Sequence, residues 1–317
     1  MKVAILGSSG FLGKNLMLNL QKGWETFAFF NTFTEFPKWA EKHGIPGGTV
    51  FVRQDLSRKF DYPYPNSIPK HFDLVISLIG DTRKLDKKHL PMQNFNSDPL
   101  ALTGFFRRFT CDKFLYFSSG CVYEGHSGII SAYDTKDLKP FTAYAIAKRT
   151  SEMLLDYFVK DGCIKRYLNV RFFGAYGPHQ RNEKITTKLI KTFFIDKKNE
   201  ITLYGSGENL IDAMYVQDAI DWILLAVNQK FENETIDFGR ASPITIKELA
   251  LRTAAVCGVA NPIIKWDAET ASKEDYYFRL GDHWFRPETP FGYEFKFPLE
   301  HGIRRLKTWL IKNGEIE

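Results

Sequence analysis

A tyrosine and a lysine four residues apart are the residues of this 317-residue chain best suited to acid–base chemistry. Tyr144 and Lys148 fall on one face of a segment with helical spacing of apolar residues. An ammonium beside a phenol favours the phenolate, so we expect the pKa of Tyr144 to fall towards neutral pH. Ser119 ends an apolar run upstream, and its hydroxyl can bond the same substrate oxygen. This set predicts a general acid–base site for a sugar or alcohol hydroxyl.

A glycine-rich turn at the start of the chain predicts the cofactor half of the site. An apolar run at 3–6 is followed by GSSGFLG at 7–13, and leucines then recur at helical spacing. A flexible turn is the alternative, but the strand before it and the helix after it favour dinucleotide binding at the new helix N-terminus. In such a turn the first glycine permits the bend, the second admits a pyrophosphate and the third allows close helix packing. The expected contacts are Gly7, Ser9, Gly10, Phe11, Leu12 and Gly13.

Alternating strands and helices are expected to position these residues. Strands are expected at 24–30, 49–56, 72–80, 113–119 and 167–173, with helices at 98–109 and 142–160. This order predicts an α/β fold with a doubly wound parallel sheet, a Rossmann domain, over 1–172. The pattern changes at 173–317, which we expect to form a smaller mixed substrate lobe, with 212–240 packing back on the first domain.

Composition excludes several classes of protein. Hydrophobic content of 44% and charged content of 25% are typical of a soluble globular protein. The net charge of +6 is scattered along the chain, so no nucleic-acid partner is expected. No run is apolar enough for a membrane span or signal peptide, and the four cysteines lack CxxC spacing, which together predict a cytoplasmic protein. The histidines lack metal-ligand spacing, and no metal is expected.

Taken together, the motifs resemble the extended short-chain dehydrogenase/reductases, in the NAD-dependent epimerase/dehydratase family that acts on nucleotide sugars. The resemblance covers almost the whole chain. It rests on GSSGFLG at 7–13, QDL at 54–56, SLIG at 77–80, SSGCVYEG at 118–125, YAIAK at 144–148, RFFGAYGP at 171–178 and YGSGENLIDAMYVQDA at 204–219.

The resemblance implies further cofactor contacts beyond the glycine turn. It places Asp55 and Leu56 at the adenine, Leu78, Ile79, Gly80, Asn94 and Ser118 along the cofactor, Phe173 beside the nicotinamide, and Lys148 on the nicotinamide ribose as well as near Tyr144. Asn31 ends the second strand, where an acid would hold the ribose diol of NAD and a base the 2′-phosphate of NADP. Asn31 is neither an acid nor a base, although its amide can hydrogen-bond a ribose hydroxyl. The expected cofactor is therefore NAD, and NADP is not excluded.

The implied reaction starts with hydride transfer from a sugar carbon, usually C4, while Tyr144 takes the hydroxyl proton. Return of the hydride to the opposite face makes an epimerase, which is the expected activity. The alternative is an NADPH-dependent reductase of a 4-keto sugar. A third possibility is a dinucleotide sensor without turnover, against which the intact Ser119, Tyr144 and Lys148 weigh.

Two positions depart from the dehydratase pattern. Family dehydratases carry an Asp-Glu pair where this chain has Gly120 and Cys121, which disfavours a 5,6-elimination. Cys121 and His179 stand where GDP-fucose synthases carry a cysteine and a histidine for 3,5-epimerisation. That similarity makes Cys121 and His179 candidate catalytic residues, although a buried cysteine and a loop histidine are the simpler interpretation.

The phosphate contacts of the substrate also differ from the family pattern. Gly174 and Ile211 stand where many relatives have Asn and a phosphate-binding Arg. Arg181, Arg279 or Arg286 could replace that arginine, because a guanidinium suits bidentate phosphate contacts. The alternative is a substrate without the usual diphosphate arrangement. The expected partners are a nucleotide-activated sugar and, by resemblance, a second copy of the chain. The helices at 98–109 and 142–160 would pair with their mates in a four-helix bundle.

Overall fold

The computed structural model describes residues 1–58, 67–82, 90–125, 138–267 and 290–313. The chain divides into two compact units. The first comprises Met1–Gly125, Ala132–Phe172 and Ile223–Asp237, and the second comprises His126–Ser131, Phe173–Trp222 and Phe238–Glu317.

The first unit is built on a seven-stranded sheet of order β11-β6-β5-β4-β1-β2-β3. Its strands are β1 (Lys2–Leu6), β2 (Glu25–Phe30), β3 (Val50–Arg53), β4 (His71–Ser77), β5 (Thr110–Phe117), β6 (Ile164–Phe172) and β11 (Glu234–Phe238). Strands β1 to β6 pair in parallel register. The order reverses between β1 and β4, which confirms the predicted doubly wound α/β fold. In such folds, ligands bind beyond the carboxyl ends of the strands at this switch point.

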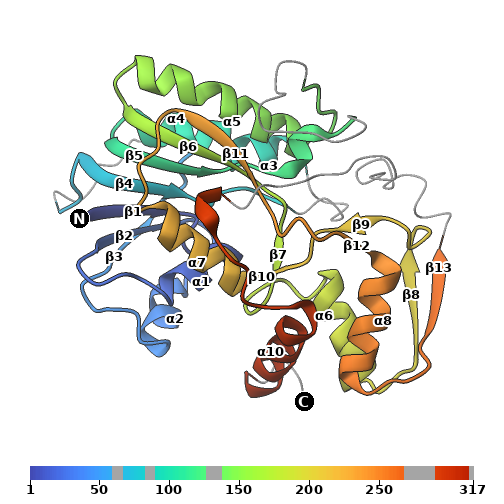
Figure 1. The fold of residues 1–317 in the computed structure, drawn as a ribbon. Coiled ribbons are helices and arrows are strands. Elements are labelled where there is room, and N and C mark those ends of the chain that lie inside the picture. The colour runs from blue at the N-terminus through green and yellow to red at the C-terminus, as the bar shows by residue number, and fades with distance from the viewer. Residues whose placement is uncertain (59–66, 83–89, 126–137, 268–289, 314–317) are drawn as a thin grey trace. The chain divides into compact units, whose positions relative to one another are not determined.

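Helices cover both faces of this sheet, as Figure 1 shows. The helices of the first unit are α1 (Phe11–Met17), α2 (Phe36–Lys42), α3 (Pro91–Asn96), α4 (Pro99–Phe106) and α5 (Ala143–Lys160), with the 3₁₀ turn η1 (Gly120–Tyr123). Successive side chains of a strand point to opposite faces. Phe29 of β2 therefore contacts Phe105 of α4 edge-to-face, with ring centroids 5.4 Å apart. Phe30 contacts Phe36 of α2 instead, at 5.3 Å.

The second unit has its own hydrophobic core, in which Leu189, Leu249 and Ile303 are fully buried. Its helices are α6 (Ile185–Ile190), the π-helical η2 (Lys191–Ile195), α8 (Ile246–Cys257), the turn η5 (Pro290–Gly292) and α10 (Leu299–Lys312). Its strands form the pairs β10-β7, β12-β9 and β13-β8. Their bounds are β7 (Ala175–Tyr176), β8 (Glu200–Tyr204), β9 (Leu210–Ile211), β10 (Met214–Tyr215), β12 (Ile244–Thr245) and β13 (Ile263–Asp267).

Helix α7 (Val216–Ala226) runs from the second unit into the first along the chain. Thr245 is the N-cap of α8, and its side chain accepts the Glu248 N–H at 3.0 Å. The helix ends at Gly258, which has a left-handed φ of 87°. No helix in the described part of the chain is both long and apolar enough to cross a membrane.

Candidate active site

The glycine turn is held tightly between β1 and α1. Gly7 adopts a φ of +79°, and the N–H groups of Gly7 and Ser8 both donate to the Phe29 carbonyl at 3.1 Å. A Cβ on Gly13 would lie 2.6 Å from the Ser8 carbonyl oxygen, closer than atoms can approach. Gly7 and Gly13 therefore have the bend and close-packing roles that the sequence predicts for them.

The backbone after β4 lies against this turn. A Cβ on Gly7 would come within 3.0 Å of the Leu78 carbonyl group, and the Leu78 N–H donates to the Leu6 carbonyl at 2.9 Å. The predicted cofactor contacts at 7–13 and 78–80 are thus adjacent, at the point where strand order reverses. Asn94 is near the same loop, because its Nδ2 donates to the Asp81 carbonyl at 2.7 Å.

The adenosine of the cofactor is predicted to lie at the ends of β2 and β3. Arg53 Nε donates to the Asn31 carbonyl at 3.3 Å, which joins the two strand ends. The Asp55 carboxylate accepts the Ser57 hydroxyl at 2.7 Å and pairs with Arg58 at 3.1 Å. Asp55 is therefore held in a local turn, with its neighbour Leu56 buried.

The Lys148 ammonium is fixed by three acceptors. Its Nζ lies 2.6 Å from Asp98 Oδ2 and donates to the carbonyls of Phe117 at 2.7 Å and Ile79 at 2.9 Å. The two carbonyls take two of the three N–H donors of the ammonium, and its charge is paired with Asp98, so a nicotinamide ribose would compete with Asp98 for the third donor. Gly80 allows this arrangement, because a Cβ there would come within 3.2 Å of Nζ.

Ser119, Tyr144 and Cys121 are gathered at the end of β5. Ser119 is the N-cap of η1 and accepts the Cys121 N–H at 3.3 Å. It also hydrogen-bonds the Tyr144 phenol, so the predicted serine–tyrosine pair is in contact. Tyr144 lies in the first turn of α5, whose start is fixed by Glu124: the carboxylate accepts the Thr142 N–H at 3.0 Å and its hydroxyl at 2.9 Å.

The expected fall in the pKa of Tyr144 is wrong for this structure. Burial raises its pKa well above the usual value, and the charges of Cys121, Asp98 and Asp81 raise it further, whereas the Ser119 hydrogen bond lowers it. The i,i+4 spacing places Lys148 on the correct face, but its ammonium is directed to the Asp98 carboxylate. The positive charge that should favour the phenolate is therefore offset by a negative one.

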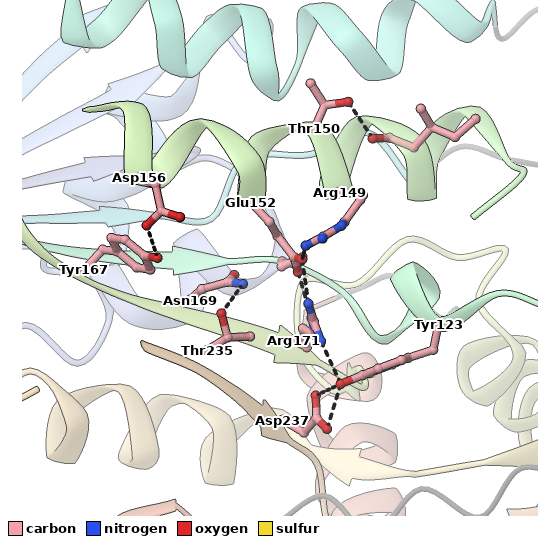
Figure 2. A network of polar contacts seen from close by, with 12 residues as sticks. Tyr123, Arg149, Thr150, Glu152, Asp156, Tyr167, Asn169, Arg171, Thr235 and Asp237 are labelled. Atoms are coloured by element: carbon pink, nitrogen blue, oxygen red, sulfur yellow. Dashed lines mark hydrogen bonds and ion pairs between the residues drawn. The ribbon is translucent and has the colours of Figure 1, made fainter. Parts of the chain in front are cut away.

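A buried ion pair connects α5 to the sheet (Figure 2). Glu152 follows Lys148 by one helical turn and forms a bidentate pair with Arg171 of β6, at 2.9 and 2.8 Å. Ser118 Oγ also donates to Glu152, at 2.6 Å. Burial would raise the pKa of Glu152, but the Arg171 guanidinium and these hydrogen bonds hold it below the usual value.

The ion pair continues into a second buried contact through Tyr123 of η1. Arg171 Nη1 donates to Tyr123 Oη at 2.8 Å, and the Tyr123 hydroxyl donates to Asp237 of β11, also at 2.8 Å (Figure 2). Together these contacts join α5, β6, η1 and β11 around the strand ends that carry Ser119. Asp98, Glu152 and Arg171 are not among the site residues that the sequence predicts. The only signals were an acid directly before Pro99, a YxxxKxxxE spacing and an arginine inside an apolar strand.

The remaining predicted residues lie in the second unit. His179 has a left-handed φ of 67°, and its ring contacts Trp309 edge-on with centroids 4.8 Å apart. The Phe173 N–H donates to the Phe238 carbonyl at 3.0 Å. Ile211 of β9 pairs with Ile244 of β12. The roles of Phe173 at the nicotinamide and of His179 with Cys121 stay predictions.

Two of the three candidate phosphate-binding arginines cannot be placed. Arg279 and Arg286 lie outside the described residues, whereas Arg181 follows the loop that carries His179. Gln180 fixes this loop: its Oε1 accepts the Gly177 N–H at 3.2 Å and its Nε2 donates to Thr186 at 2.7 Å. Across the described residues, no three His, Cys, Asp or Glu side chains cluster as metal ligands would.

Residues 3–239 match the model of the NAD dependent epimerase/dehydratase family. An uncharacterized protein of Methanocaldococcus jannaschii is 25% identical, with 99% of this chain and 97% of that protein covered. CDP-abequose synthase of Yersinia pseudotuberculosis is 25% identical, over 78% of this chain and 82% of its own.

Solved structures agree on the fold. The UDP-glucuronic acid 4-epimerase of Bacillus cereus in complex with NAD superimposes with a TM-score of 0.77 at 18% identity, covering 99% of both chains. The family match spans the glycine turn, Ser119, Tyr144 and Lys148. This chain is therefore a member of the NAD dependent epimerase/dehydratase family, the extended short-chain dehydrogenase/reductases that its motifs resemble.

Proposed function

We propose that this protein is an NAD-dependent epimerase that inverts C4 of a nucleotide-activated sugar through a transient 4-keto sugar. The observation that carries the proposal is the contact of Ser119 with Tyr144, one turn before the anchored Lys148, beside the glycine turn. The Bacillus cereus 4-epimerase, with the same fold, was solved with NAD bound. Gly120 and Cys121 offer no acid pair for elimination, which argues against a dehydratase.

Separate parts of the chain bind the cofactor and transfer the proton. The turn at 7–13 holds the pyrophosphate of the cofactor, and the 78–80 backbone lines it. Bound NAD supplies the acceptor that takes and returns the hydride at C4. Tyr144 removes the proton from the C4 hydroxyl and later gives it back, and Ser119 holds the same oxygen as its charge changes.

A single substitution tests the assignment of Tyr144. Tyr144→Phe keeps the ring but removes the proton carrier, and general acid–base catalysis typically contributes about 10²–10⁴-fold. We expect turnover of UDP-sugars to fall by at least this range, while NAD binding measured by calorimetry stays unchanged. Tyr157→Phe makes the same change on the exposed surface of α5 and should keep full activity. Full activity of Tyr144→Phe would refute the assignment.

A 4-keto-sugar reductase remains the second candidate. It is favoured by the position of Cys121, whose backbone N–H donates to Ser119 Oγ at 3.3 Å, beside the proposed acid–base group. A reductase consumes NAD(P)H stoichiometrically, whereas an epimerase consumes none. Loss of reduced-cofactor absorbance with a 4-keto sugar therefore separates the two. If Cys121→Ala retains all epimerisation, the thiol has no catalytic role.

We also propose that two copies of the chain pair through α4 and α5. An apolar surface covers α3, α4 and α5, which lie together in Figure 1. Met92 of α3, Leu100 of α4 and Leu154 of α5 line a common groove, and Ile146 and Met153 are exposed on α5, Met153 by 66%. Contiguous exposed apolar residues of this kind mark interaction surfaces. A second copy would bury them in a four-helix bundle, as the family resemblance implies.

A further inference from the structure

A neutral buried cluster surrounds the anchored lysine. Asp98 and Lys148 are each only 3% exposed, and their charged atoms lie 2.6 Å apart. The other carboxylate oxygen of Asp98 accepts two hydroxyls, from Tyr116 of β5 at 2.8 Å and from Ser151 of α5 at 2.6 Å. Both oxygens of Asp98 are therefore engaged, and each partner is fixed by a strand or helix.

The position of Asp98 is set by the local fold. It is the N-cap of α4, and Pro99 follows at the first helical position, so the Asp98 side chain leaves the helix axis where α4 meets β5 and α5. Its side chain caps no backbone N–H of α4. The carboxylate is directed instead into the cluster, towards the lysine that follows Tyr144 by one turn.

We propose that Asp98 is a positioning residue, which fixes the Lys148 ammonium between the ends of β4 and β5 and offsets its charge at Tyr144. The inference rests on the proposed epimerase function. Without Asp98, the ammonium would keep two backbone carbonyls, those of Ile79 and Phe117, and its full positive charge would act on the phenol. Asp98 thus raises the pH at which the phenolate forms.

Other titratable groups lie near the same pair. Cys121 of η1 and Asp81 after β4 act on Tyr144 in the same direction as Asp98. Glu152 acts on Tyr116 within the cluster, but its own charge is paired with Arg171. Asp98 differs from Cys121 and Asp81 in one respect: it pairs directly with Lys148.

Asp98→Asn tests the proposal through a pH profile. Removing a nearby negative charge lowers the pKa of the phenol, so the acid limb of kcat should move to lower pH by roughly one unit. Asp156→Asn is the matched control, because it makes the same change on α5, roughly 18 Å along the helix from Tyr144 at about 1.5 Å per residue. This control should leave the profile in place. A fall in kcat with an unmoved acid limb would show a merely structural role and overturn the proposal.

A second readout needs no sugar. In NAD-saturated protein carrying isotope-labelled tyrosine, the Tyr144 resonance is identified by its loss in Tyr144→Phe and titrated by NMR. A shift to lower pH in Asp98→Asn supports the inference even if no sugar is turned over, in which case only the proposed function fails. An unshifted titration overturns the inference alone. Asp98→Thr, which offers the ammonium a neutral oxygen of similar size, should give the same shift. If neither variant folds, stability rather than positioning is the role of Asp98, and the proposal is wrong.

Discussion

The Glu152 carboxylate and the Arg171 guanidinium form a bidentate ion pair, 2.9 and 2.8 Å long, with each side chain no more than 2% exposed. The pair connects α5, one turn beyond Lys148, to β6. Charges this deeply buried stabilise mainly when both partners are present. Arg171 alone would be left desolvated without a carboxylate, and Glu152 alone would keep only the partly exposed Arg149, at 3.0 Å.

Removing one partner should therefore lower the free energy of unfolding much more than removing both partners. We expect Arg171→Met to lower the free energy of unfolding by about 3–5 kcal/mol. Adding Glu152→Leu should recover about 1–3 kcal/mol of that loss. Urea denaturation of the two single variants and the double variant measures this coupling. Arg252→Met, which breaks half-exposed pairs with Glu248 and Glu300, should cost less than about 1 kcal/mol. Additive losses at 152 and 171 would contradict the coupling.

The same pair predicts an acid dependence of stability. The folded pKa of Glu152 lies below its ordinary value of 4.5, mainly because Arg171 outweighs the effect of burial. Stability from the ionised carboxylate is thus fully present above pH 4.5 and is lost as pH falls through the folded pKa. Unfolding free energies measured across this range should fall more steeply for wild type than for Glu152→Gln. Parallel curves would be inconsistent with a lowered pKa.

Gly13→Ala should disrupt the cofactor turn. The new Cβ would lie 2.6 Å from the Ser8 carbonyl oxygen, and overpacking of this kind costs about 1–3 kcal/mol. If this energy destabilises the conformation of the turn that binds NAD, the affinity for NAD drops roughly ten- to hundred-fold, which calorimetry can measure. Gly47→Ala is the control, because a Cβ there meets nothing within 4 Å. Equal affinities of the two variants would show that the turn does not hold the cofactor.

Met153→Glu tests the proposed pairing of two copies. The side chain is 66% exposed in a single chain, so the variant should fold normally but place a charge inside the bundle. Light scattering at micromolar concentration should show a dimer for wild type and a monomer for the variant. Leu251→Glu alters an exposed leucine of α8 and should remain dimeric. A monomeric wild type would contradict the pairing.

The sheet could be predicted because its signals are local. Strands β1, β2 and β4 each appear in the sequence as a short run of mostly apolar residues. The glycine turn directly follows such a run and directly precedes a helix, so its position in the fold is also a local property. The contact of Ser119 with Tyr144 also follows, since Ser119 comes directly after β5 and Tyr144 lies in the first turn of α5, the helix between β5 and β6.

The electrostatics of the site could not be predicted in the same way. Asp98 meets Lys148 only after α4, β5 and α5 pack, and a helical spacing does not say where a flexible ammonium will point. The expectation that the pKa of Tyr144 falls is wrong for that reason, because burial and nearby negative charge depend on tertiary packing. In the sequence, Arg171 only interrupts an apolar strand. Its role becomes evident in the fold, where its guanidinium donates to Glu152.

The central claim is that a hydride leaves C4 and returns to the opposite face of the same carbon. UDP-glucose and UDP-glucuronic acid, each deuterated at C4, test it directly when incubated with the NAD-loaded protein in ordinary water. The account predicts that one of them yields the C4 epimer with its deuterium retained and with no net change in NADH absorbance. Inversion with loss of the deuterium to solvent, or stoichiometric accumulation of NADH, would contradict it.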